Sequence, residues 1–73
     1  MTSEYLVSLV VPLRNEASII EAFVEDALRV LSAQCRHFEL VLVDDRSTDD
    51  TLSVVSRLMQ RHSAMRLIRL SRR

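Results

Sequence analysis

The chain has 73 residues, 48% of them hydrophobic, and its ten basic and ten acidic residues give a formal net charge of zero at pH 7. A chain of this length forms at most one small domain, which buries only about 60% of its unfolded surface and is marginally stable. The apolar content excludes a disordered chain, and the balanced charge excludes a general attraction to nucleic acid or to an anionic membrane.

The cysteine count and the hydropathy pattern indicate the cellular compartment in which the chain is expected. The single Cys35 excludes an internal disulfide, and no Cys or paired His lies near it at metal-site spacing. No apolar segment approaches the roughly 20 residues that cross a bilayer, and the N-terminus lacks the features of a signal peptide. We therefore expect a soluble, cytoplasmic chain. The absence of Gly also excludes the common glycine-rich nucleotide loops.

The first predicted element is a strand over residues 6–12, ending at Pro12 because proline cannot donate to a sheet ladder. After a loop at residues 13–16, Asn15 or Ser18 is expected to cap a helix, and Ser18 with Glu21 resembles a capping box. Apolar residues at helical spacing predict its buried face. They are Ile20, Phe23, Val24, Ala27, Leu28 and Leu31.

A polar connection over residues 32–37 leads to a second predicted strand over residues 38–43. Its nearly unbroken Leu/Val run is typical of a parallel strand buried on both faces. The strand ends in Asp44 and Asp45, and Ser47 or Thr48 is expected to cap the next helix. Asp49 and Asp50 are then expected in the first helical turn, where carboxylates interact favourably with the helix dipole.

The second predicted helix buries Leu52, Val55, Leu58 and Met59 and ends near His62, and residues 65–70 predict a third strand. The order β-α-β-α-β predicts an α/β fold with a Rossmann-like parallel sheet. Ligands of such sheets bind outside the carboxyl ends of the strands, which places the acidic pair where a site is expected. The chain stops soon after the third strand, so we expect a truncated domain.

Two motifs in this chain resemble the start of a family 2 glycosyltransferase with the GT-A fold. Residues 10–16 (Val-Val-Pro-Leu-Arg-Asn-Glu) match the family's first strand end, which commonly carries Tyr where this chain has Arg14. Residues 43–51 (Val-Asp-Asp-Arg-Ser-Thr-Asp-Asp-Thr) match its second strand end, and residues 67–72 are similar to its third strand. The resemblance implies that residues 1–73 are the N-terminal, donor-nucleotide-binding part of a GT-A domain.

The resemblance also implies a reaction and a binding site. Family members transfer a sugar from a nucleotide-sugar donor, here UDP- or GDP-linked, to a lipid, polysaccharide or protein acceptor. A carboxylate at Asp45 can accept hydrogen bonds from the base or ribose, while Asp44 orients the turn or shares that task. Arg14 can stack on a base or reach a phosphate. The implied nucleotide contacts are Pro12, Arg14, Glu16, Val43, Asp44 and Asp45.

The family's catalytic base and its metal-binding Asp-x-Asp segment lie further along the chain than residue 73. Sugar transfer needs a cation, Mg or Mn, to neutralise the leaving diphosphate, and a base to activate the acceptor. We therefore assign no catalytic or metal-ligating residue here and expect the chain alone to be inactive. Membrane association is expected only through sequence beyond residue 73.

Two alternatives to a glycosyltransferase come from other classes of protein. A receiver-like signalling module also carries a buried strand that ends in an acidic pair, but it places that pair after the first strand. A non-catalytic pairing module would self-associate through an uncovered sheet edge.

Overall fold

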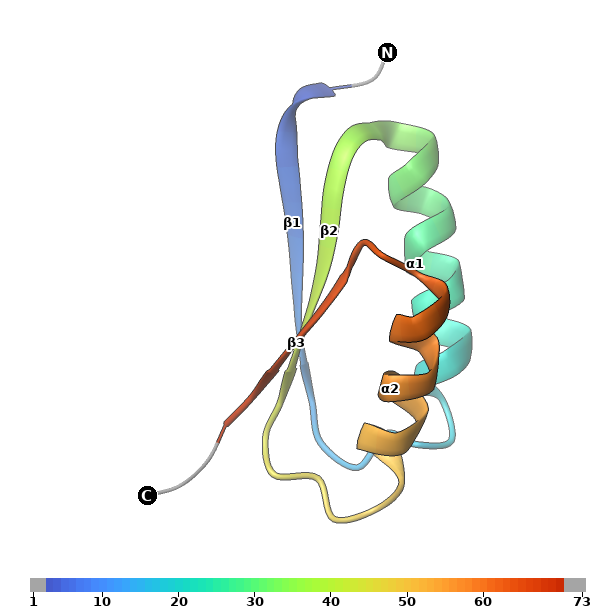
Figure 1. The fold of residues 1–73 in the computed structure, drawn as a ribbon, viewed down its shortest axis with the longest axis vertical. Helices are drawn as coiled ribbons and strands as arrows, with labels where there is room; N and C mark the ends of the chain where they lie inside the picture. The colour runs from blue at the N-terminus through green and yellow to red at the C-terminus, as the bar shows by residue number, and fades with distance from the viewer. Residues whose placement is uncertain (1–2, 71–73) are drawn as a thin grey trace.

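A computed structural model describes residues 3–70 of the chain (Figure 1). Its elements are β1 (Ser3–Leu13), α1 (Ile20–Gln34), β2 (Cys35–Asp44), α2 (Thr51–Arg61) and β3 (Met65–Arg69). The strands form one parallel sheet in the order β1-β2-β3. The predicted α/β, Rossmann-like β-α-β-α-β arrangement is therefore confirmed. The last part of the motif resemblance, residues 71–72, lies outside the described residues.

Both helices cover the same face of the sheet (Figure 1). Two crossovers of the same hand that step along a sheet in one direction place their helices on one side. The core lies between this face and the helices, with Leu40 and Leu42 of the central strand fully buried. The other members of the core cluster are Leu13, Ile20, Val24, Leu28, Val55, Leu58 and Met65.

The opposite side of the sheet, which we call the open face, is covered by no element of residues 3–70 (Figure 1). Side chains alternate between the two faces of a strand, so Val41 and Val43 point away from the helices. Val41 is nevertheless only 9% exposed, because its register partners on β1 and β3 flank it. On this face the central strand is therefore buried at Val41 by its neighbouring strands and not by a helix. Exposed residues on this face include Leu6 (63%), Val10 (58%) and Ile68 (50%).

Several predicted boundaries need correction. Pro12 lies inside β1 rather than at its end, which is tolerated because β1 is an edge strand with only one hydrogen-bonded neighbour. The predicted polar connection is absent, since α1 runs to Gln34 and the backbone turns extended at Cys35 to begin β2 at once. Phe23, predicted to be buried, is 39% exposed.

The predicted capping box of α1 is also wrong. Its N-cap is Ile19, and neither Asn15 nor Ser18 nor any other side chain caps the helix. Instead, the backbone carbonyl of Glu16 accepts hydrogen bonds from Ile19 N–H at 3.0 Å and from Ile20 N–H at 2.9 Å. The first turn is thus hydrogen-bonded to the loop that follows β1, so the position of that loop fixes where α1 begins.

Candidate functional site

The two strand-end segments singled out by the motifs meet at the carboxyl edge of the sheet. Leu13 is the register partner of Asp44, and Pro12 is the partner of Val43. Beyond the last paired residues, Asp45 N–H donates to the Leu13 carbonyl at 2.9 Å. Residues 14–19 and 45–50, which we call the first and second edge loops, therefore leave the sheet side by side.

Asp44 is a buried carboxylate, 2% exposed, that organises the second edge loop from inside. Its two oxygens accept hydrogen bonds from Ser47, one from the backbone N–H at 3.1 Å and one from Oγ at 2.5 Å. Asp commonly stabilises a turn by bonding the backbone that follows it. The turn also needs a left-handed backbone at Arg46, whose φ is 56°. Asp44 therefore orients the turn.

Asp45 is far more accessible. Its side chain is 42% exposed, and its described partner is the neighbouring Arg46, whose Nε lies 3.2 Å from Oδ1. Such exposed pairs are screened by water and are readily exchanged for another partner. The Asp45 carboxylate is therefore the acidic group of the predicted pair that remains open to a ligand.

The other predicted contacts surround the same edge. Pro12 and Val43 lie on the open face, because their strand neighbours Leu13 and Asp44 point toward the helices. Arg14 is exposed and pairs with no other residue of the described range 3–70.

Glu16 is half-buried, and its backbone N–H donates to Thr51 Oγ1 at 2.8 Å. The structure therefore brings the six predicted residues to one edge of the sheet, five of them at least partly accessible and Asp44 beneath them.

Asn15, to which the motifs assign no role, joins the two edge loops directly. Its backbone is left-handed, with φ of 53°, and its N–H donates to Ser47 Oγ at 3.0 Å. Its side-chain Oδ1 accepts hydrogen bonds from the N–H groups of Thr48 at 2.7 Å and Asp49 at 3.3 Å. The available signal was the absence of Gly, because Asn is among the residues that most readily take its place at positive φ.

Asp49 starts the second helix by a route that differs from the prediction. The helix begins at Thr51 with Asp50 as N-cap, so both acids precede its first turn, and neither Ser47 nor Thr48 caps it. Asp49 Oδ1 accepts Thr51 N–H at 2.9 Å and also Thr51 Oγ1, while Oδ2 accepts Ala17 N–H at 3.3 Å. These bonds, above all that from the Thr51 hydroxyl, lower the pKa of Asp49.

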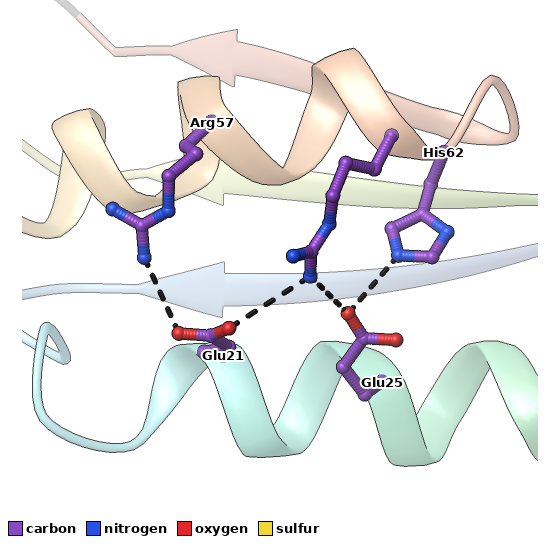
Figure 2. Close-up of polar contacts among 5 residues, drawn as sticks. Glu21, Glu25, Arg57 and His62 are labelled. Carbon is purple, nitrogen blue, oxygen red and sulfur yellow. Dashed lines mark hydrogen bonds and ion pairs between the residues drawn. The ribbon is translucent and has the colours of Figure 1, made fainter.

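A second polar cluster, the helix–helix cluster, joins the exposed sides of α1 and α2 (Figure 2). Arg57 Nη2 lies 3.2 Å from Glu21 Oε1, and Arg61 Nη2 lies 3.7 Å from Glu21 Oε2. Glu25 Oε2 contacts both Arg61 and, at 3.1 Å, His62 Nε2. The hydrogen bond from His62, more than the charge of Arg61, lowers the pKa of Glu25.

A pocket of about 430 Å³ opens beside this cluster. It is lined by residues that include Leu28, Phe38 and Ala64, near the amino-terminal ends of β2 and β3. None of the predicted nucleotide contacts lines it. The edge loops, at the other end of the sheet, therefore remain the candidate binding site.

Within residues 3–70, no group of three or more His, Cys, Asp or Glu side chains is arranged to hold a metal ion. No helix in the same range is long and apolar enough to cross a membrane.

A parallel β-α-β-α-β sheet with two joined, acid-bearing loops at its carboxyl edge defines a Rossmann-like α/β protein. The sequence model of glycosyl transferase family 2 matches residues 8–73, and the chain belongs to this family. The resemblance inferred from the two motifs is thereby confirmed.

A relative with a glycosyltransferase name supports the same family. The chain is 38% identical over 66 residues to a dodecaprenyl-phosphate galacturonate synthase from Rhizobium johnstonii. The aligned region covers 89% of this chain and 20% of that protein. The chain therefore spans about a fifth of the length of this relative.

Proposed function

We propose that this chain is the donor-nucleotide-binding part of a family 2 glycosyltransferase that uses a UDP- or GDP-linked sugar. One observation carries the proposal: the exposed Asp45 carboxylate lies at the carboxyl edge of a parallel sheet, beside the Pro12–Glu16 segment. Nucleotides bind at this edge in open α/β sheets. Family membership supports the same role.

Each side chain at the edge has a distinct part in this proposal. Asp45 accepts hydrogen bonds from a base N–H or from ribose hydroxyls, and such charge-assisted bonds are among the stronger ones. Pro12 and Val43, adjacent on the open face, form an apolar wall for the base. Arg14, which has no described partner, stacks on the base or binds a phosphate. Asp44 remains beneath them and holds the turn.

The acceptor and the sugar-transfer step are proposed for a complete glycosyltransferase and not for this chain alone. The relative's name, dodecaprenyl-phosphate galacturonate synthase, supports a lipid phosphate among the acceptor classes considered. Residues 3–70 contain no group of three or more His, Cys, Asp or Glu side chains arranged to hold a metal ion, and the chain by itself is expected to bind nucleotide without transferring sugar. Incubation with a nucleotide sugar and Mg²⁺ or Mn²⁺ tests this, and turnover by the 73-residue chain would contradict it.

Titration calorimetry with UDP and with GDP tests nucleotide binding. Asp45→Asn is expected to lower the affinity for the bound nucleotide by about 10- to 100-fold, the loss expected for a hydrogen bond to a charged group. Asp50→Asn is the matched control, because it removes the same charge from an exposed residue in the same loop whose side chain caps nothing. Its affinity should remain that of the unmodified chain.

Three results would overturn the proposal. These are no binding of either nucleotide, equal losses in the two variants, or no loss in Asp45→Asn. Metal-dependent phosphorylation by acetyl phosphate would instead favour the receiver-like alternative, and ligand-independent association would favour the pairing module.

A further inference from the structure

Asn15 holds a backbone conformation that few residue types accept. Its φ of 53° is left-handed, where a side chain normally meets the backbone and where Gly is the usual choice. The chain contains no Gly, so Asn15 supplies this conformation with a side chain attached. Asn pays a smaller steric cost there than most residues, because its short polar side chain can bond locally. A left-handed Asn whose side chain makes contacts 33 and 34 residues away therefore does more than turn the chain.

The contacts of Asn15 hold the second edge loop from two directions. The amide oxygen accepts the N–H groups of Thr48 and Asp49, and the backbone N–H reaches Ser47 Oγ. That same hydroxyl donates to Asp44, so the first edge loop is joined to the buried carboxylate through a single oxygen. Two backbone donors at the amide oxygen also fix the amide orientation, with its NH₂ group directed away from them.

The segment held in this way includes the position proposed to bind nucleotide. Asp45 begins the second edge loop, with its N–H bonded to Leu13 and the left-handed Arg46 immediately after it. A loop fixed only at the sheet would sample several directions for the Asp45 carboxylate. Ordering such a loop when a ligand binds reduces the affinity.

We propose that Asn15 is a positioning residue that pre-orients the Asp45 carboxylate for the donor nucleotide, through its left-handed backbone and its amide oxygen. The inference rests on the proposed function of this edge as a nucleotide site. Asn15 acts through the second edge loop and does not itself contact the ligand.

Amide hydrogen exchange of the full chain, without ligand, tests the tie itself. Asn15→Gly accepts the left-handed backbone without strain and removes the whole side chain, including the amide oxygen. The Thr48 and Asp49 amides should then exchange roughly tenfold faster, the effect of losing about one hydrogen bond's free energy. The Asp45 amide, bonded to Leu13, should change little. Asn15→Asp retains an acceptor oxygen and should restore the protection, whereas unchanged exchange in Asn15→Gly would overturn the proposal.

Calorimetry with UDP and GDP tests the consequence for binding. Asn15→Gly should weaken nucleotide affinity by about tenfold. The titration is done at a temperature well below the melting temperature of the variant. Leu28→Ala controls for lost stability, because Leu28 lies in the core beside the pocket at the other end of the sheet. It should destabilise the fold more and leave the affinity unchanged.

The outcomes separate this inference from the proposed function. If the unmodified chain binds nucleotide and Asn15→Gly binds equally well, the positioning role is wrong and the proposed function stands. If the unmodified chain binds neither nucleotide, the proposed function fails, and the role of Asn15 in orienting a nucleotide contact fails with it, whatever the exchange rates show.

Discussion

The edge loops and the helix–helix cluster each join parts of the chain more than 30 residues apart, but by different kinds of contact. In the edge loops, side-chain oxygens accept hydrogen bonds from backbone N–H groups, as Asn15, Ser47 and Thr51 do. In the helix–helix cluster, long charged side chains meet each other across the surface (Figure 2). Backbone partners fix geometry, whereas exposed side-chain pairs adjust to solvent and salt.

The same hydrogen-bond arrangement occurs twice where the two edge loops meet. A hydroxyl within the second edge loop, or directly after it, accepts a backbone N–H from the first edge loop while it donates to a carboxylate of the second. Ser47 does this between Asn15 and Asp44, and Thr51 does it between Glu16 and Asp49. Each carboxylate thereby orients a hydroxyl, and each hydroxyl positions the neighbouring loop. Single contacts in the edge loops should therefore contribute more to stability than those in the helix–helix cluster, which mutation can measure.

The largest loss of stability is expected from Asp44→Ala. This change removes a buried charged acceptor and both of its hydrogen bonds to Ser47, which costs about 2–3 kcal/mol. Urea unfolding followed by circular dichroism measures the free energy of unfolding. Asp45→Ala, next in sequence but exposed, should cost less than about 0.5 kcal/mol. Equal losses in the two variants would show that the buried carboxylate does not organise the turn.

A smaller loss is expected from Thr51→Val, which keeps the shape of a fully buried side chain and removes only its hydroxyl. Glu16 N–H then loses its acceptor, at a cost of about 1–2 kcal/mol. Thr48→Val is the matched control, because Thr48 is exposed and its hydroxyl makes only a long 3.4 Å contact. The same unfolding measurement should give a change near zero for Thr48→Val. A similar loss in both variants would show that the Thr51 hydroxyl does not hold the first edge loop.

The smallest effect is expected in the helix–helix cluster, as a change in the pH dependence of stability. Hydrogen bonding to His62, followed in importance by the charges nearby, lowers the pKa of Glu25 below its ordinary value of 4.5. The stabilisation from Glu25 is therefore present above pH 4.5 and is lost as the pH falls through the lower pKa of the folded state. Glu25→Gln should remove part of this acid-induced loss.

Melting temperatures between pH 3 and 6 measure the effect of Glu25→Gln. The double variant with His62→Gln should add little to either single change, because both remove the same contact. Additive effects of the two substitutions would show that the 3.1 Å contact does not couple them. Asp49 and Glu39 also have lowered pKa values, so some acid sensitivity should remain in every variant.

The fold could be predicted because its signals are local. Apolar spacing placed both helices, and the Leu/Val run placed the central strand and the acids at its end. The tie through Asn15 could not be predicted, because it depends on two loops 33 residues apart meeting with the correct register. The capping predictions for α1 were wrong for a different, local reason, since the Glu16 carbonyl accepts the Ile19 and Ile20 N–H groups and no side chain caps the helix.

The burial of Val41 without a covering helix could not be predicted from the sequence either. A central strand looks equally apolar whether a helix covers it or whether neighbouring strands flank it, as they flank Val41. Position within the sheet, rather than the number of layers, therefore explains the Leu/Val run. The site residues themselves remain predictions from the family motifs, although the structure brings them to one edge.

The open face also affects how the stability of the chain varies with temperature. The heat capacity change of unfolding follows the apolar surface that becomes newly hydrated, and a 73-residue domain ordinarily gives about 1 kcal/mol/K. Side chains such as Leu6, Val10 and Ile68 are already at least half hydrated in the folded chain. The heat capacity change should therefore fall below the ordinary value, which makes the stability curve flatter and its maximum broader.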